Sequence, residues 1–292
     1  MTSRATPHLL APYLALAAPG SLTLLTNVLS ATSNWLVVRY LQSLLPAAAR
    51  GKASSAGGGA GQDGEGEADG WAGVVLVSFL RDFAFWGECA GKLGVDLSRH
   101  CKDGNFVFVD GLTSLFIPPV AAAATGLVSA KGRMTLTSAK LADIRRDIQA
   151  AIASVASEDK NVVLIIDQPD LLLAATEGSA IDMQNTVLSL REHVHSTIFA
   201  VSADMPLIAE QHTTMERMHA GFALDLAHQA DTVVSLRMLD TGVAKDVSGV
   251  MRITRGGGGG GGHDAGGLGV DEHEYLYYIA ADGGVRVFKR GQ

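Results

Sequence analysis

Apolar and polar positions along the first two-thirds of the chain follow two alternating patterns. Short, mostly apolar runs predict buried strands at residues 21–27, 73–79, 106–110, 161–167 and 197–201. Apolar residues at helical spacing between these runs predict helices at residues 34–45, 81–93, 138–155, 179–193 and 206–227. Because parallel strands are usually connected by helices, this order indicates a parallel sheet covered on both faces.

Several of the predicted helices have recognisable end signals. Gly94 follows the helix at 81–93, and glycine readily adopts the left-handed conformation found after helices. Thr137 or Ser138 can cap the third predicted helix, and Ser179 can cap the fourth. In each case a hydroxyl oxygen would accept a bond from an unpaired N–H of the first turn.

The pattern changes after residue 230, where short strands follow one another without predicted helices between them. These strands cover residues 232–236, 250–254, 275–279 and 285–289, and turn sequences such as DTGVAKDVSG and AADGG connect them. A parallel α/β sheet with a terminal antiparallel extension is the architecture of RecA-like ATPase cores. The sequence therefore predicts an α/β fold of the RecA-like, P-loop NTPase type.

Segments of low complexity interrupt this pattern. Residues 46–70 contain little that can pack, and the α/β pattern resumes directly after them, so we expect a flexible insertion and not a domain boundary. The glycine-rich loop at 255–269 contains the tract Gly256–Gly262, whose ordering entropy predicts mobility. Residues 111–136 show no clear pattern and include a predicted surface loop. We expect the whole chain, residues 1–292, to form one RecA-like domain.

Composition indicates a globular protein and excludes some classes of partner. Of the 292 residues, 47% are hydrophobic and 18% are charged, and the formal net charge is −7. An acidic chain lacks a general basic footprint, so any contact with nucleic acid must come from local patches or from partner subunits. No apolar run reaches the roughly 18 residues that a membrane span needs, so no membrane partner is expected.

The N-terminus and the cysteines carry less specific signals. Residues 1–20 resemble a secretory signal, but prolines and a histidine interrupt the apolar region, so we expect no export. Cys89 and Cys101 match no zinc spacing, which favours two unpaired thiols in a reducing compartment. The histidines have no spaced set of Cys, His or Asp partners around them, so no metal site is predicted.

The segment LLTNVLSATSNWLVVRYL, residues 24–41, occupies the place of a phosphate-binding loop between the first strand and the first helix. Such a loop has the form GxxxxGK[ST]: glycines admit backbone N–H groups, a lysine neutralises phosphate charge and a hydroxyl binds Mg²⁺. Here Asn27 and Thr32 stand at the glycine positions. Ser33 stands at the lysine position and Asn34 at the hydroxyl position. The sequence therefore predicts a degenerate phosphate loop, whose polar residues are more simply interpreted as helix caps than as phosphate ligands.

Asp167 stands at the end of the apolar run NVVLIID, where an acidic residue assists Mg²⁺ in nucleotide sites. Acidic residues also follow buried strands simply to begin a turn, and Pro169 supports a turn here. Without a lysine-bearing loop, the structural role is preferred. No nucleophile–base pairing or GxSxG elbow stands out, so no catalytic residue is predicted.

Several segments resemble a known family. IIDQPDLLLAAT, TGVAKDVSGVMRITRGG, DEHEYLYY and VRVFKR are similar to the sixth subunit of the Elongator complex. The opening PYLALAAPGSLTLLTNVLSATSNWLVVRYLQSLL resembles the fungal members of that family. The resemblance runs over residues 12–290, with the low-complexity segments as insertions. Its most specific element is the TG-AKDV-G turn followed by RGG, because order and spacing both fit.

The resemblance implies a RecA-like subunit without working phosphate motifs, which is not itself an enzyme. It implies a hetero-hexameric ring with the fourth and fifth subunits, which binds tRNA and links nucleotide hydrolysis to tRNA release. The full complex modifies the wobble uridine of tRNA anticodons, with catalysis in a different subunit of the Elongator core. No cofactor is expected on this chain alone, and ATP is expected at ring interfaces. The expected location is the cytoplasm and also the nucleus.

Few residue roles carry over from the resemblance. In RecA-like rings the loops after the later strands face nucleic acid, and here these are Gln168–Ala180 and Ala203–His212. Lys245, Arg252 and Arg255 in the C-terminal hairpin are better electrostatic candidates for contact with RNA or with a neighbouring subunit. The alternatives are a solvated pair at Lys245 and a solvated strand end at Arg255, or an arginine finger that reaches a neighbour's nucleotide.

Other functions are kept as alternatives: a divergent NTPase that uses Asp167, and a recombinase-like accessory protein that binds DNA. ATP binding by the isolated chain would favour the first, and preference for duplex DNA over tRNA would favour the second. An assembling subunit also needs apolar outer faces. The aromatic candidates for such faces, or else for the core, are Trp35, Phe83, Phe85 and Trp86.

Overall fold

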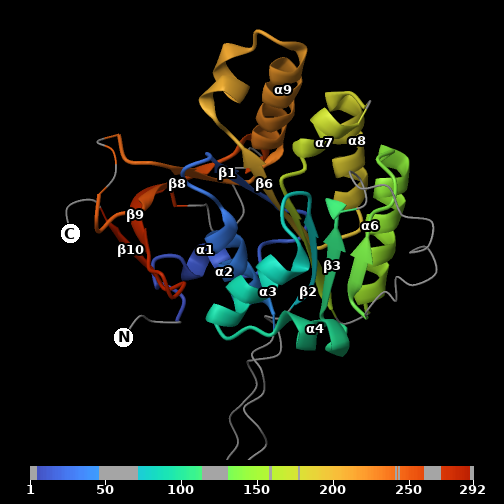
Figure 1. The fold of residues 1–292 in the computed structure, drawn as a ribbon, viewed down its shortest axis with the longest axis horizontal. Helices are drawn as coiled ribbons and strands as arrows, with labels where there is room; N and C mark the ends of the chain where they lie inside the picture. Colours follow the sequence, from blue (N-terminus) through green and yellow to red (C-terminus); the bar gives the residue numbers. More distant parts are fainter. Residues whose placement is uncertain are drawn as a thin grey trace, which may run out of the picture.

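The structure is a computed structural model that describes residues 5–45, 72–113, 131–157, 160–176, 178–240, 242, 244–259 and 271–289. Its strands are β1 (Leu22–Asn27), β2 (Ala72–Ser78), β3 (Phe106–Asp110), β4 (Arg133–Thr135), β5 (Asn161–Asp167), β6 (Ser196–Ser202), β7 (Thr232–Arg237), β8 (Gly249–Arg255), β9 (His273–Ile279) and β10 (Val285–Lys289). They form one ten-stranded sheet in the order β10-β9-β8-β7-β1-β6-β5-β2-β3-β4 (Figure 1).

Strand direction divides the sheet into two parts. From β7 through β1 to β4, neighbouring strands run parallel. From β7 to β10, neighbouring strands run antiparallel. This mostly parallel sheet with a C-terminal antiparallel extension confirms the predicted fold class.

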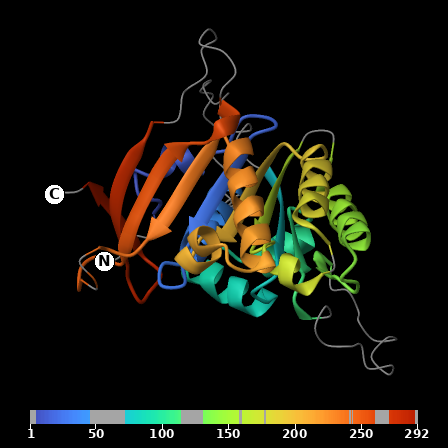
Figure 2. The same ribbon diagram turned by 90° about the horizontal axis from the view of Figure 1, so that it is seen from above.

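Helices cover the two faces of the parallel part in separate layers (Figures 1 and 2). One layer contains α1 (Ala11–Leu14), α2 (Asn34–Leu44), α3 (Phe83–Lys92) and α4 (Leu97–Asp103). The opposite layer contains α6 (Leu141–Val155), α7 (Leu171–Ala175), α8 (Ala180–Arg191) and α9 (Thr214–Gln229). Among the described helices, none is long and apolar enough to cross a membrane.

The central strands are apolar on both faces because each face meets a layer of helices. In β5, Ile165 belongs to the core beneath α2, whereas Leu164 and Ile166 belong to the core beneath α6 and α8. Successive strand residues point to opposite faces, so a strand between two helix layers needs apolar residues at every position. This explains why the mostly apolar runs in the sequence predicted these strands correctly.

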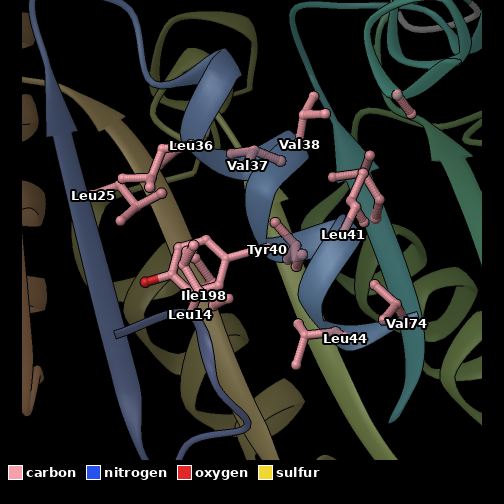
Figure 3. Packing of buried hydrophobic residues seen from close by; sticks show 14 of the residues in the cluster. Leu14, Leu25, Leu36, Val37, Val38, Tyr40, Leu41, Leu44, Val74 and Ile198 are labelled. Carbon is pink, nitrogen blue, oxygen red and sulfur yellow. The ribbon is translucent and has the colours of Figure 1, made fainter. Parts of the chain in front are cut away.

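Figure 3 shows how α2 packs on the sheet. Leu36, Tyr40 and Leu44 recur every fourth residue along the helix and are buried. Leu25 of β1 and Ile198 of β6 lie in the same core cluster. This packing fixes the start of α2 directly above the end of β1, where the predicted phosphate loop would lie.

The aromatic side chains that the sequence assigned either to the core or to an outer face belong largely to this core. Trp86 is fully buried, and the other candidate aromatic residues pack against the same cluster while partly exposed. Trp35 stacks on Tyr277 of β9 with ring centroids 5.0 Å apart. Cys89 and Cys101 are free thiols, as predicted. Burial raises the pKa of the Cys101 thiol to about 11, as expected for a structural cysteine.

The hydrophobic pattern missed the shortest elements. These are α1, α4, α7 and β4, the last with only three residues. So few residues do not show a helical or strand periodicity of apolar positions, so these elements were missed because they are short. Most of the predicted surface loop within 111–136 lies outside the described residues.

The helix predicted at 206–227 is divided in the structure. Pro206–Glu210 forms a π-helical turn, and Gln211 then adopts a left-handed φ of 48°. Thr213 and Glu216 form a capping box at the start of α9, each side chain accepting a bond from the other's backbone N–H. The sequence signal for this helix start, Thr213 followed three residues later by Glu216, lies inside the segment predicted as one helix.

The predicted helix ends are partly confirmed. Gly94 follows α3 with φ of 85°, and Ser179 forms a capping box with Asp182 at the start of α8. The prediction for α6 is wrong, because that helix begins after Lys140. Ser138 Oγ accepts a bond from the Lys140 N–H at 3.2 Å, and a hydrogen bond from Ser138 lowers the pKa of Asp143 in the first turn, so this hydroxyl supports the start of the helix without being its N-cap.

The glycine-rich loop begins with an ordered turn, whereas we expected the whole tract to be mobile. Gly257–Gly259 forms a 3₁₀ turn against the end of α9, and the Gly258 N–H bonds to Ala230 O at 2.9 Å. A Cβ on the first glycines of the tract would meet backbone atoms of that helix end. Residues 260–269 and the predicted insertion at 46–70 lie outside the described residues.

Candidate functional site

The candidate site lies at the carboxyl edge of the parallel strands, where ligands bind in open α/β sheets. In register, Asn27 of β1 stands beside Ser202 of β6, and Asp167 of β5 stands beside Ser78 of β2. Each of these residues ends its strand. The edge therefore gathers polar side chains from neighbouring strands at the place of the predicted phosphate loop.

The chain turns sharply after β1 and does not form an open loop. A bridge joins Val28 and Ala31, with the Ala31 N–H bonded to Val28 O at 2.9 Å. Ser33 is buried, and its Oγ accepts a bond from Asn27 Nδ2 at 3.1 Å. The same amide group donates to Val201 O at 3.1 Å. Side chains of the chain itself therefore fill the interior of this turn.

The predicted capping role of Ser33 is wrong. Ser33 stands at the N-cap position of α2, but its side chain makes no capping bond to the first turn. Asn34 is the first residue of the helix, and Thr32 is exposed before it. The hydroxyl at the lysine position therefore ties the start of α2 to the end of β1.

Asp204, in the loop after β6, binds a backbone N–H of the turn after β1. Its Oδ1 accepts a bond from the Leu29 N–H at 3.0 Å, and the Ala203 N–H bonds to Asn27 O at 2.7 Å. A phosphate loop depends on free N–H groups and on positive charge. Here the Asp204 carboxylate accepts a hydrogen bond from one such N–H and adds negative charge to the edge. Both effects disfavour phosphate binding.

Asp167 is buried at the end of β5 and bonds across the sheet. Its Oδ2 accepts a bond from Ser78 Oγ at 2.7 Å, and Ser78 Oγ accepts one from the Arg81 N–H at 3.0 Å. Burial raises the pKa of Asp167 to about 6, and the hydrogen bond from Ser78 opposes this rise. The carboxyl group therefore links β5 to β2.

A second buried acidic group, Asp170, lies close to Asp167 in the chain. Its Oδ2 is 3.8 Å from His219 Nδ1 of α9, and His219 Nε2 is 2.8 Å from Ser202 O. Burial raises the pKa of Asp170, and His219 opposes the rise. Gln168 has a left-handed φ of 56°, and its Oε1 accepts a bond from Ser202 Oγ at 2.7 Å. The network thus joins the ends of β5 and β6 to α9.

Sequence reasoning missed Asp204 and His219. The spacing of the histidines gives His219 no role, yet it occupies the buried face of α9 together with Ala220 and Phe222. A polar residue inside an apolar helical stripe was the available signal. Among the residues that the structure describes, no group of three or more His, Cys, Asp and Glu side chains could hold a metal ion.

The basic candidates of the C-terminal hairpin do not form one cluster. Arg252 and Arg255 stand at i and i+3 in β8, so their side chains point to opposite faces of the sheet. Arg255 lies opposite Thr232 at the start of β7, which is the amino edge of the parallel strands, away from Asp167. Lys245 is exposed in the connection between β7 and β8, at the carboxyl edge. The structure therefore separates these three residues.

Comparison with known proteins gives consistent matches. The profile of a family described as "Elongation complex protein 6" matches residues 69–265. Elongator complex protein 6 of Xenopus laevis is 26% identical over 225 residues, which cover 75% of this chain and 80% of the relative. The Elongator complex protein 6 homolog of Schizosaccharomyces pombe is 24% identical over 207 residues, which cover 69% and 73%.

Among solved structures, a KaiC-like protein from the hyperthermophilic archaeon Pyrococcus horikoshii superposes with a TM-score of 0.51. The match has 14% sequence identity and covers 92% of this chain and 90% of that chain. At this identity the likeness concerns the fold alone. It agrees with the RecA-like class that the strand and helix pattern predicted.

Proposed function

The chain belongs to the Elongation complex protein 6 family, and from this premise we propose that it is a non-catalytic subunit of the Elongator complex. It assembles with the fourth and fifth subunits into a hetero-hexameric RecA-like ring. The ring binds tRNA and supports wobble-uridine modification by the catalytic core of the complex. ATP binds at ring interfaces and not to this chain alone, and the assembly works in the cytoplasm and also in the nucleus.

The turn after β1 is the observation that carries the non-catalytic role. Ser33, at the position of the phosphate-binding lysine, is buried against Asn27 and presents no charge to a nucleotide. The Leu29 N–H is bonded to the carboxylate of Asp204. A P-loop NTPase needs a cation and free N–H groups at this place. The turn is retained as an element of the fold and not as a nucleotide site.

A nucleotide-binding measurement tests this role. We expect calorimetry to detect no binding of ATP–Mg²⁺ to the isolated chain at millimolar nucleotide, with the fourth and fifth subunits measured alongside. Binding that disappears in Asp167→Ala would contradict the proposal and support a divergent NTPase. Preference of the assembled ring for duplex DNA over tRNA, at one stated salt concentration, would instead support a DNA-binding accessory protein.

The carboxyl edge also carries apolar side chains suited to contact with a neighbouring subunit. Leu29 is 88% exposed and Met205 is 71% exposed. The bond between the Leu29 N–H and Asp204 holds the loops of these two residues together. Exposed apolar side chains held on a rigid rim are typical of interfaces that bury them on association.

Co-assembly tests the ring itself. The full chain, purified and mixed with the fourth and fifth subunits, should form one compact species with the mass of a hetero-hexamer. Size-exclusion chromatography with light scattering gives that mass directly. Three separate monomeric species at micromolar concentrations would contradict the proposed function.

A further inference from the structure

One face of the antiparallel extension is left open. On the α2 side, Tyr275 and Tyr277 of β9 are buried in the helical core. On the other side, α9 lies over β1, and Val233 of β7 packs against the core beneath it. Figure 2 shows β8, β9 and β10 with no helix in front of them on the α9 side. In the part of the chain that the structure describes, this side of these strands faces outward.

Strand alternation and register define the side chains on this face. Met251 and Ile253 point into the core beneath α2, so their neighbours in β8 point to the α9 side. Across the strands, Tyr278 stands opposite Arg286 and Leu276 opposite Phe288. We call this surface the open face, with members Arg252, Glu274, Leu276, Tyr278, Arg286 and Phe288. Val250 of β8 points to the same side but is buried.

Aromatic and guanidinium groups are combined on the open face. The Arg286 guanidinium carbon lies 5.0 Å from the centroid of the Tyr278 ring. Arg286 is exposed, and Tyr278 and Phe288 are half-buried. An arginine held over a ring can contact phosphate, while neighbouring aromatic surface stacks on bases. Sheet faces that carry such residues on adjacent strands are a recurrent platform for single-stranded RNA.

Charge distinguishes the two ends of these strands. Glu274 stands opposite Arg252 across the β8–β9 pair and is 3.5 Å from the Arg237 guanidinium, which also pairs with Asp240 at 2.7 Å. Arg252 and Arg286 are exposed and outnumber the one glutamate of the open face, Glu274, so this face is net positive although the whole chain carries −7. Glu272 directly precedes β9 and adds negative charge at the amino end of that strand. An anionic partner is therefore favoured most strongly at Arg286, which stands opposite Tyr278 near the carboxyl end of β9.

We propose that the open face binds a single-stranded segment of RNA. Tyr278 and Phe288 stack on bases, while Arg252 and Arg286 contact phosphates. The inference rests on the proposed function, since tRNA presents single-stranded loops and ends. Of the basic residues selected from the sequence, Arg252 alone belongs to this surface, because Arg255 points to the opposite face.

Binding of fluorescent oligouridylate to the full-length chain tests the phosphate contacts. Arg252→Ala/Arg286→Ala should weaken binding about tenfold and should lower the slope of log affinity against log salt by about 1.4, from two lost contacts. The matched control is Arg99→Ala/Arg146→Ala, which removes exposed arginines of α4 and α6 that pair with carboxylates of their own helices. The control should leave affinity and slope unchanged.

Loss of the stacking contacts can be distinguished from loss of the phosphate contacts by the salt dependence of binding. Tyr278→Leu/Phe288→Leu keeps apolar volume on the open face and should weaken binding about tenfold with an unchanged salt slope. Thermal unfolding of each variant checks that the fold is retained. If the leucine variant does not fold, Tyr278→Leu alone gives the same comparison.

Other outcomes overturn the proposal. They are absence of oligouridylate binding by the wild-type chain at low salt, or unchanged affinity in both open-face variants. A third outcome also overturns it: the open-face variants fail to assemble into the ring while the isolated variant chains keep the RNA affinity of the wild type. That result would identify the open face as a protein contact. Failure of the wild-type chain to assemble would contradict only the ring proposal, because the RNA measurement uses the isolated chain.

Discussion

At the scale of single residues, the carboxyl edge depends on buried polar groups whose pairing is incomplete. Asp167 is fully buried, and Ser78 donates to its Oδ2. Among the described residues, none bonds to its Oδ1. Burial disfavours the ionised carboxylate, which is why the pKa of Asp167 rises to about 6. A group of this kind makes the free energy of unfolding depend on pH.

We expect Asp167→Asn to be more stable than the wild type near pH 8, by at most about 3 kcal/mol. The pKa of Asp167 is about 6 in the folded chain against an ordinary 3.8, so the folded state binds its proton more tightly. The stabilisation from this proton is complete below about pH 4 and is lost as pH rises through about 6. The amide does not titrate, so its advantage should be near zero at pH 4, grow as pH rises from 4 to 6, and level off above about pH 6.

Urea denaturation of both proteins between pH 4 and pH 8 measures this difference. The matched control is Asp246→Asn, at an exposed position between β7 and β8. An advantage of Asp167→Asn that grows as the pH falls would contradict the argument.

At the scale of elements, a small residue lets a helix end approach the sheet. Gly73 lies in β2 beside Val155, the last residue of α6, and a Cβ at Gly73 would overlap Val155 Cγ1. Valine has one strongly preferred side-chain rotamer in a helix, so it cannot easily turn away. The distance between β2 and α6 is therefore set by the absence of a side chain at Gly73.

We expect Gly73→Ala to lower the free energy of unfolding by about 1–3 kcal/mol through overpacking. Val155→Ala opens space at the same contact, so the double variant should be more stable than the sum of the single effects predicts. Urea denaturation of the four proteins in this cycle measures the coupling. Gly91→Ala in α3 is the control, since a Cβ there would meet nothing within 4 Å, and it should not destabilise. Additive effects at Gly73 and Val155 would contradict the packing argument.

The sequence predicts the long elements well and the tertiary choices within the site poorly. Strands buried between helix layers are apolar at nearly every position, and their runs stand out. The sequence also predicts a degenerate phosphate loop, because Ser33 stands at the lysine position of the phosphate-loop pattern. The direction of its hydroxyl is not visible, since it can bond to the first turn of α2 or inward to Asn27. Asp204 and His219 reach the site from distant segments, and no local spacing links them to Asp167.

At the scale of the whole molecule, the surfaces suited to partners lie apart from one another. Leu29 and Met205 stand at the carboxyl edge of the parallel strands, in the turn after β1 and in the loop after β6. The open face lies on β8–β10, beyond α9. The proposed contacts with a neighbouring subunit and with RNA therefore use different surfaces and do not compete.

We expect Leu29→Ser/Met205→Ser to weaken assembly with the fourth and fifth subunits about tenfold or more, because apolar area buried at the interface is lost. Mass photometry over a dilution series measures the fraction of hexamer. Leu188→Ser, which changes a 44% exposed leucine on α8, is the control and should assemble normally. Equal assembly by all these variants would place the subunit contact elsewhere.

The position of β1 in the sheet has a consequence for biosynthesis. Within the described sheet β1 lies between β6 and β7, and about 170 residues separate Asn27 from Ser196. At bacterial or eukaryotic translation rates, the N-terminal strand leaves the ribosome roughly 10–30 s before its first neighbour. During that interval its apolar residues need a chaperone or transient contacts. Truncated products that end before β6 leave β1 without either neighbour and should therefore accumulate as insoluble material, even though β2 to β5 are present.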